Sequence, residues 1–333
     1  MPRDNMSNAL VSAAPVATFR DYVAIARFDH MTKHVFIIPG IVLAYALRGI
    51  YTENLIASVI FGLISATCIA AANYVINEWL DREFDKFHPL KSQRTAVNIN
   101  LNKSIVYIEY ASLVVVGLAT ATVVGLSFSI VSIAFVISGI IYNVQPFRTK
   151  DHAFIDVLSE SLNNPIRLML GWAIIDPTSL PPSSLLFTYW MGGAFLMNAK
   201  RLSEYRSIVE VQGKELLGKY RPSFHSYTAS SLMVACLLYA MMSAFFLAVF
   251  LVKYRIEYLL ATPIIAALFA QYFALSLKRD SVAQRPERLF HEKRLMATVI
   301  TTLIMLVLLT FVQIPALERL TSQHFIELSP AGR

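Results

Sequence analysis

Three carboxylates and two asparagines share one helical face near the end of a long apolar segment. Asn73, Asn77, Asp81 and Asp85 follow one another at four-residue intervals, and Glu78 lies on the same face. Four residues turn an α-helix by about 400° and raise it by about 6 Å, so these side chains form one sloping stripe. Carboxylates so close together repel one another unless a cation lies between them. Mg²⁺ prefers such oxygen ligands and often shares them with substrate phosphates, so the stripe predicts a metal and phosphate site.

Spaced carboxylates on a helix are also typical of a solvated surface, here with Arg82 and Lys86 as neighbours. Two observations favour a functional site. Asn73 and Asn77 still lie within the apolar segment, where polar groups are costly and usually functional. The sequence then changes abruptly to DREFDKFHPLK, which marks a boundary between membrane and water.

A second polar cluster interrupts the apolar segment 150–172. Asp156 and Glu160 are four residues apart, and Arg167 follows Asp156 by about three helical turns. Two functions of Arg167 are open: an internal pair with Glu160 or Asn163, or a contact with substrate. We expect Asp156 to face the acidic stripe and complete its site.

Basic residues near both clusters supply the positive charge that bound phosphates need. Arg binds phosphate through paired hydrogen bonds and Lys as a point charge, although both also mark membrane topology. The candidate cations are Lys91, Arg94, Lys150, Arg167, Lys200 and Arg201. Glu204 and Tyr227, with Asn73 and Asn77, complete the predicted substrate-binding set.

The composition is that of an integral membrane protein. Of 333 residues, 56% are hydrophobic and only 15% are charged, whereas soluble domains have about 25% charged residues. The net charge of +7 then reflects Lys and Arg at one membrane face, not affinity for nucleic acid. Cys68 and Cys236 lie in separate apolar segments, which argues against a disulfide scaffold or a thiolate metal site.

Apolar segments near 20 residues long predict an all-α fold of nine transmembrane helices. They cover approximately residues 33–49, 55–79, 104–124, 126–143, 153–175, 185–199, 230–252, 258–277 and 295–314. Most of the 29 Lys and Arg residues lie in the loops of one side, which places the N-terminus and the site in the cytoplasm. We expect a cytoplasmic tail over 1–22, a transmembrane domain over 23–320 and a C-terminal tail over 321–333.

The segment NYVINEWLDREFDKF resembles the first Asp-rich motif, NDxxDxxxD, of the UbiA-type intramembrane prenyltransferases. Asn77, Asp81 and Asp85 match this motif, and Glu78 stands where Asp is usual. The resemblance implies nine helices around a central cavity and two acidic motifs that bind diphosphate through Mg²⁺. It implies catalytic roles for Asp81, Asp85 and Asp156, and Mg²⁺ ligation by these three with Glu78.

Further motifs resemble one branch of the family, decaprenyl-phosphate phosphoribosyltransferase. ARFDHMTKH is similar to its RPxxWxKN segment, with Arg27 kept and His34 at the Asn position. The other matches, in chain order, are HPLKSQR to HPxKxxRP; Lys150, Asp156 and Arg167 to its second polar helix; 200–204 to KRxxE; and 226–228 to SYT.

This branch implies Mg²⁺-dependent transfer of a 5-phosphoribosyl group from phosphoribosyl diphosphate to a polyprenyl phosphate held in the lipid bilayer. The enzyme would lie in the bacterial inner membrane and make a precursor of a lipid-linked arabinosyl donor. Rhizobial nodulation-associated members, linked to Nod-factor arabinosylation, belong to the same branch.

Two other functions stay open. The first is the more common chemistry of the family, transfer of a prenyl group from prenyl diphosphate to an aromatic acceptor. The second is transport of a phosphorylated solute, which intramembrane polar residues would allow but which the lack of a clear internal repeat disfavours. The sequence does not determine the oligomeric state.

Overall fold

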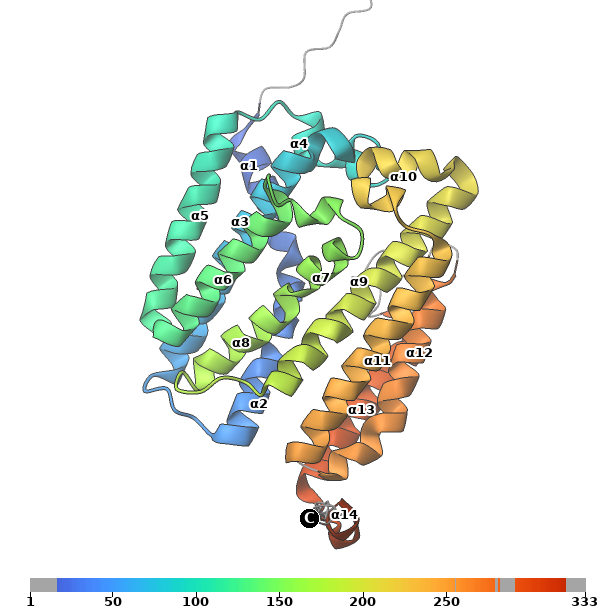
Figure 1. Cartoon of the computed structure of the whole chain (residues 1–333). Coiled ribbons are helices and arrows are strands. Elements are labelled where there is room, and N and C mark those ends of the chain that lie inside the picture. Colours follow the sequence, from blue (N-terminus) through green and yellow to red (C-terminus); the bar gives the residue numbers. More distant parts are fainter. Residues whose placement is uncertain (1–16, 255, 279–280, 282–290, 322–333) are drawn as a thin grey trace, which may run out of the picture. The chain divides into compact units, whose positions relative to one another are not determined.

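The computed structural model describes residues 17–254, 256–278, 281 and 291–321 and is built of helices (Figure 1). The predicted all-α fold is confirmed, whereas most of the N-terminal tail and nearly all of the C-terminal tail lie outside the described residues. The chain divides into two compact units. The first holds the chain up to Asp156, Ile166–Leu180 and Glu215–His225, and the second holds Val157–Pro165, Pro181–Lys214 and the chain from Ser226 on.

The first unit is organised around one long helix, α3, which packs along α5 and α6. Its α-helices are α1 (Phe19–Ile25), α2 (Ile38–Arg48), α3 (Leu55–Asp85), α4 (Thr95–Asn98), α5 (Lys103–Val124), α6 (Leu126–Asn143), most of α8 (Asn163–Ile175) and most of α10 (Lys214–Tyr220). Four short 3₁₀ helices join them: η1 (Phe28–Phe36), η2 (Lys91–Gln93), η3 (Thr149–Asp151) and η4 (Pro222–His225).

Helix α3 begins at Asn54, whose side chain accepts a hydrogen bond from the Ala57 amide and caps the first turn. Small residues then let α5 approach closely: a Cβ at Gly117 would lie 2.7 Å from the Ile69 side chain. The 31 residues of α3 span about 45 Å, more than the ~30 Å hydrocarbon core. Its last turns, which carry the acidic stripe, therefore extend past the apolar layer.

The second unit is a bundle in which α9 packs along α11. Its α-helices are most of α7 (Ile155–Ser161), α9 (Ser183–Gln212), α11 (Ala229–Tyr254), α12 (Thr262–Ser276), α13 (Lys293–Phe311) and α14 (Pro315–Thr321), with η5 (Ile256–Ala261) between α11 and α12. Buried Asn198 of α9 donates from its side-chain amide to the Leu232 carbonyl of α11 at 2.7 Å. Such side-chain bonds join helices where apolar contacts give little specificity.

Five helical segments among the described residues are long and apolar enough to cross a membrane, which makes the chain a multi-pass membrane protein. They are Leu55–Asp85, Lys103–Val124, Leu126–Asn143, Ala229–Tyr254 and Ile256–Ser276. The predicted span 33–49 is instead η1 followed by the short helix α2.

The prediction of one helix over 153–175 is wrong, because the chain breaks at Leu162 between α7 and α8. Pro165 explains the break, since proline has no amide hydrogen to donate to the preceding turn. The predicted span 185–199 falls within α9, and α13 covers the predicted span 295–314 up to Phe311. The number of nine membrane spans thus stays a prediction, and five long apolar helical segments among the described residues support it.

Helices α2 and α8 touch backbone to backbone. A Cβ at Gly40 would lie 2.1 Å from the Leu168 carbonyl oxygen, and one at Gly171 would lie 2.1 Å from that of Ile37. Glycine is therefore required at both positions, because any side chain would push the helices apart. This contact holds α8 against the start of α2.

The ends of the same two helices are joined through the buried carboxylate of Asp176. It accepts hydrogen bonds from Arg48 Nε at 3.2 Å, from the Thr178 amide at 2.9 Å and from the Thr178 and Ser179 hydroxyls. Burial by itself raises the pKa of Asp176, but the hydrogen bonds from Ser179, Thr178 and Arg48 outweigh it and hold this pKa at about 2. The carboxylate thus stabilises the fold as an anion.

We expect Asp176→Asn to lower the free energy of unfolding by about 1–3 kcal/mol, because the amide cannot accept all of these bonds. Equilibrium unfolding of the detergent-solubilised protein measures the loss. Since the folded pKa of Asp176 is lowered, its contribution is complete above the unfolded value of about 4 and disappears as the pH falls through the folded value. Arg48→Gln, which removes one half-exposed partner, should cost about 1 kcal/mol or less; an equal loss in both variants would contradict this assignment.

Candidate functional site

The C-terminal end of α3 carries Asp81, which binds two cations from the loop after α6. Asp81 Oδ1 lies 2.6 Å from Lys150 Nζ and 2.8 Å from Arg148 Nη2. The side chains of Lys150 and Arg148 are only 5% and 9% exposed, whereas that of Asp81 is 18% exposed. Two enclosed cations therefore converge on one carboxylate that solvent still reaches.

The loop conformation that presents Arg148 is held in place by several contacts. Arg148 has a φ of 28°, a conformation that side chains rarely adopt and that costs on the order of 1–3 kcal/mol. Its Nε donates to Asp151 at 2.8 Å and its Nη1 donates to the Asn143 carbonyl at 3.0 Å. These bonds offset the strain and aim the guanidinium at Asp81.

The predicted asparagines of α3 bind α6. Asn77 Nδ2 donates to Asn143 Oδ1 at 2.6 Å, and the same oxygen accepts from Lys150 Nζ at 2.9 Å. Asn77 thus helps to position Lys150 through Asn143. Asn73 donates to the Phe135 carbonyl at 3.3 Å and packs directly on Gly139, so it joins the two helices.

Asp85 and Glu78 hold the segment that follows α3. Asp85 Oδ2 lies 2.6 Å from Arg94 Nη1, and Asp85 Oδ1 lies 3.9 Å from Lys91 Nζ. The buried carboxylate of Glu78 accepts a hydrogen bond from the Ala96 amide at 3.3 Å. Lys91 and Arg94, both predicted phosphate ligands, are therefore held next to the acidic stripe.

The second acidic wall is built by Asp156, which is fully buried. Its Oδ2 lies 3.1 Å from Arg221 Nη2 and accepts a hydrogen bond from the Ser223 hydroxyl at 3.2 Å. Arg221 also donates to the Tyr142 hydroxyl at 2.9 Å, and Lys150 Nζ lies 5.8 Å from the Tyr142 ring centroid.

Asp81 and Asp156 therefore belong to one network, linked through Lys150, Tyr142 and Arg221. Burial lowers the pKa of Lys150 to about 8, against the opposing effect of Asp81. Lys150 still carries its charge at neutral pH. The network can thus hold oxyanions between fixed positive charges.

Four predicted residues lie in the second unit instead: Lys200, Arg201, Glu204 and Tyr227. Buried Arg201 lies 2.6 Å from Glu160 Oε2 and 3.6 Å from Glu204 Oε2, while Tyr227 is fully buried. Glu160 thus binds Arg201 within this unit, and Asn163 donates to the Glu160 carbonyl at 3.1 Å. A pair of Arg167, which belongs to the first unit, with Glu160 or Asn163 stays a prediction.

The predicted metal ligands each have another partner in this structure. Within the described ranges, no three Asp, Glu, His or Cys side chains lie close enough together to hold one metal ion. Their chemistry nevertheless fits Mg²⁺, because the donors are carboxylate oxygens and Asp81 is partly open to solvent. Ligation by Glu78, Asp81, Asp85 and Asp156 stays a prediction.

Sequence reasoning missed Arg148, Arg221, Tyr142 and Asn143. No local spacing in the sequence links either arginine to the acidic residues. Arg148 lies 67 residues from Asp81 in the chain. Asn143 could have been found from the sequence, because it is a polar residue at the end of an apolar segment, as Asn77 is.

We expect Arg221→Gln to destabilise the protein by about 3–5 kcal/mol, because it breaks a buried ion pair by removing the charged partner of the Asp156 carboxylate. Equilibrium unfolding in mixed micelles measures this effect. Asp156→Asn in the same background should recover part of the loss, and Lys219→Gln, from an exposed pair on α10, should change little. An Arg221→Gln protein as stable as the wild type would show that the pair is not formed.

Comparison with known proteins gives one family. A model of the UbiA prenyltransferase family matches residues 35–299. A protoheme IX farnesyltransferase of Alkalihalophilus pseudofirmus is 26% identical over 239 residues, which cover 67% of this chain and 73% of that protein. A protoheme IX farnesyltransferase of Geobacillus kaustophilus is 27% identical over 214 residues, which cover 60% of this chain and 64% of that protein.

Solved structures agree on the fold. A UbiA homolog from Archaeoglobus fulgidus, bound to GPP and Mg²⁺, has a TM-score of 0.65 at 20% identity and covers 87% of this chain and 98% of its own. A structure of digeranylgeranylglyceryl phosphate synthase has a TM-score of 0.61 at 14% identity, with 88% and 99% covered.

Proposed function

The chain belongs to the UbiA prenyltransferase family, and we propose that it transfers a prenyl group from a prenyl diphosphate to an acceptor and releases diphosphate. The observation that carries this proposal is the convergence of two enclosed cations, Lys150 and Arg148, on Asp81. The relatives named as farnesyltransferases and the homolog bound to GPP and Mg²⁺ support the same donor.

A prenyl diphosphate has one highly charged end and one apolar end. As the C1–O bond breaks, diphosphate leaves with the bonding electrons and its negative charge grows. Lys150 and Arg148 would bind its oxygens, and they need no rearrangement among themselves because Asn143 and Asp151 already hold them. Fixed charges of this kind stabilise a transition state more than mobile water does.

Mg²⁺ would be held by Asp81, with Asp85, Glu78 and Asp156 as the other predicted ligands. When bound, it neutralises charge on the leaving diphosphate. The apolar helices of the membrane domain would hold the prenyl chain away from water. On the topology inferred from Lys and Arg, the site faces the cytoplasm from a bacterial inner membrane.

A second candidate is transfer of a phosphoribosyl group from phosphoribosyl diphosphate to a polyprenyl phosphate. Two phosphorylated substrates need more positive charge, and the first unit gathers Lys91, Arg94, Arg148, Lys150 and Arg221 around three aspartates. The ordered motif matches favour this branch, and its product would lead toward a lipid-linked arabinosyl donor, including one for Nod factors. The named relatives and the homolog bound to GPP favour a prenyl diphosphate donor, so we rank phosphoribosyl transfer below prenyl transfer.

The two donors are separated by one assay on the full-length protein with Mg²⁺. Labelled geranyl or farnesyl diphosphate is offered with a lipid-soluble extract, and labelled phosphoribosyl diphosphate with polyprenyl phosphate. We expect prenyl label in a new product together with released diphosphate. Transfer of the phosphoribosyl label alone would replace the first candidate by the second, and no transfer from either donor would contradict both.

We expect Asp81→Asn to lower kcat roughly 100- to 1,000-fold, because it removes the carboxylate on which both cations and the predicted metal depend. Diphosphate release measures this effect, and a chelator should abolish activity until Mg²⁺ is restored. Glu83→Gln, an exposed carboxylate two residues away on the same helix, is the matched control and should stay within about twofold. Full activity of the Asp81→Asn protein would count against the site.

A further inference from the structure

Arg167 of α8 is a buried cation without a counter-ion among the described residues of the first unit. The residue belongs to that unit and is 7% exposed. Its Nε has no hydrogen-bond partner, and no acidic side chain described in the first unit forms an ion pair with it. Its guanidinium lies 5.1 Å from the centroid of the Phe135 ring.

The contact with Phe135 does not account for this burial. A cation–π contact contributes about 2 kcal/mol when desolvated, whereas removing an ion from water costs several kcal/mol. Every other cation described in this network has a carboxylate within 4 Å: Lys91, Arg94, Arg148, Lys150 and Arg221. The unmatched charge of Arg167 therefore indicates a missing anion.

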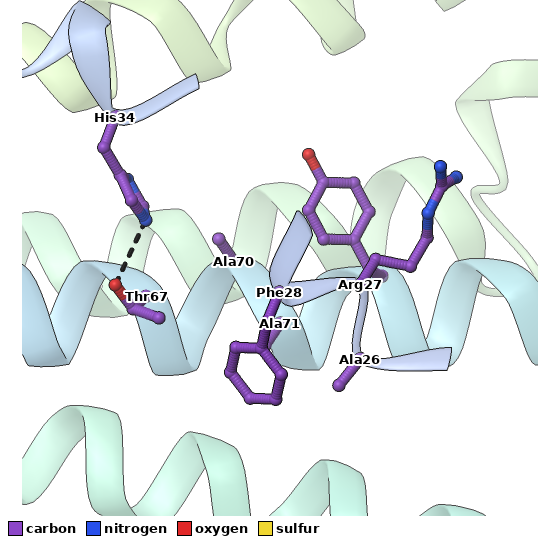
Figure 2. Close-up of a pocket in the computed structure, with 8 residues that line it drawn as sticks. Ala26, Arg27, Phe28, His34, Thr67, Ala70 and Ala71 are labelled. Carbon is purple, nitrogen blue, oxygen red and sulfur yellow. Dashed lines mark hydrogen bonds between the residues drawn. The ribbon is translucent and has the colours of Figure 1, made fainter. Parts of the chain in front are cut away.

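A small pocket with a second unmatched polar group lies close to Arg167. Its lining includes Arg27, His34, Thr67 and Tyr74, of which Figure 2 labels the first three. His34 Nε2 and the Thr67 hydroxyl are hydrogen bonded at 3.2 Å, while His34 Nδ1 is buried and has no partner among the described residues. The charge of Arg167 acts on the His34 ring and on Tyr74.

This group lies deeper in the membrane domain than the acidic network. Tyr74 lies seven residues before Asp81 on α3, and Thr67 lies fourteen residues before Asp81. These separations correspond to about 10 Å and about 21 Å along the helix. Arg167 lies at the level of Phe135, to which Asn73, the neighbour of Tyr74, is hydrogen bonded. Asn73, which marks this level, lies about two turns of α3 before Asp81.

We propose that Arg167, with His34, forms a second anion subsite that holds a carboxylate or phosphate of the acceptor substrate. The inference rests on the proposed function only in naming the acceptor as the ligand. The acceptor is thus an acidic molecule whose anion lies deep while its nucleophilic atom faces the diphosphate.

Ligand-induced stabilisation of the full-length protein in detergent tests this subsite without turnover. The probes are benzoate, for an aromatic carboxylate, and farnesyl phosphate, for a lipid phosphate. We expect at least one to raise the melting temperature of the wild type, and Arg167→Gln to weaken its apparent affinity roughly 10- to 100-fold. The probe that responds identifies the source of the anion.

The ligand-free proteins separate a binding role from a structural one. Without ligand, Arg167→Gln should be at least as stable as the wild type, because it removes an uncompensated buried charge. Arg82→Gln is the matched control, since it loses a guanidinium that lies 3.9 Å from the Trp79 ring and should bind both probes normally. A destabilised Arg167→Gln protein with unchanged probe affinity, or a wild type that binds neither probe, would overturn the proposal.

Failure of the proposed prenyl-transfer function can be distinguished from failure of the Arg167 subsite. Stabilisation by geranyl diphosphate with Mg²⁺ should depend on Asp81 and persist in Arg167→Gln. If that response is absent while benzoate or farnesyl phosphate still binds through Arg167, the donor chemistry is wrong and the second subsite stands. In turnover, Arg167→Gln should raise KM for the acceptor and leave KM for the donor unchanged.

Discussion

The ion pair between Asp81 and Lys150 organises the candidate site. It joins the end of α3 to the loop after α6 within a largely enclosed space, and Arg148 shares the same carboxylate. Buried ion pairs are stable only when hydrogen bonds satisfy the remaining donors. Here Asn143 and Asp151 provide those bonds, and Asn77 fixes Asn143 in turn. The positions of the site residues follow from this network.

Charge balance changes with depth in the first unit. Near the end of α3, Asp81, Asp85 and Asp156 each have a cationic partner, so substrate phosphates would exchange one oxyanion for another. Deeper along α3, Arg167 has no acidic partner among the described residues of the first unit. A substrate that supplies an anion would form an ion pair with Arg167 and be bound more tightly for that reason. The same helix then serves two different electrostatic sites.

Several polar residues in the apolar helices join helices. Asn73 and Asn77 connect α3 to α6, and Asn198 connects α9 to α11. Asp85 and Asp156 differ, since each combines burial with a charged partner. These asparagines bond to a neighbouring helix, whereas the Arg167 Nε has no hydrogen-bond partner.

The sequence by itself determined the membrane class, the long helix α3 and the placement of Asn73, Asn77, Asp81 and Asp85 on one face, because hydropathy and the 3.6-residue period are local properties. Tertiary structure decided which charges meet: Arg148 and Lys150 at Asp81, Arg221 at Asp156, and Arg201 at Glu160. Partners separated by 41 to 69 residues are chosen by helix packing, which no local pattern encodes. That Arg167 has no acidic partner within the first unit likewise follows only from which helices surround it.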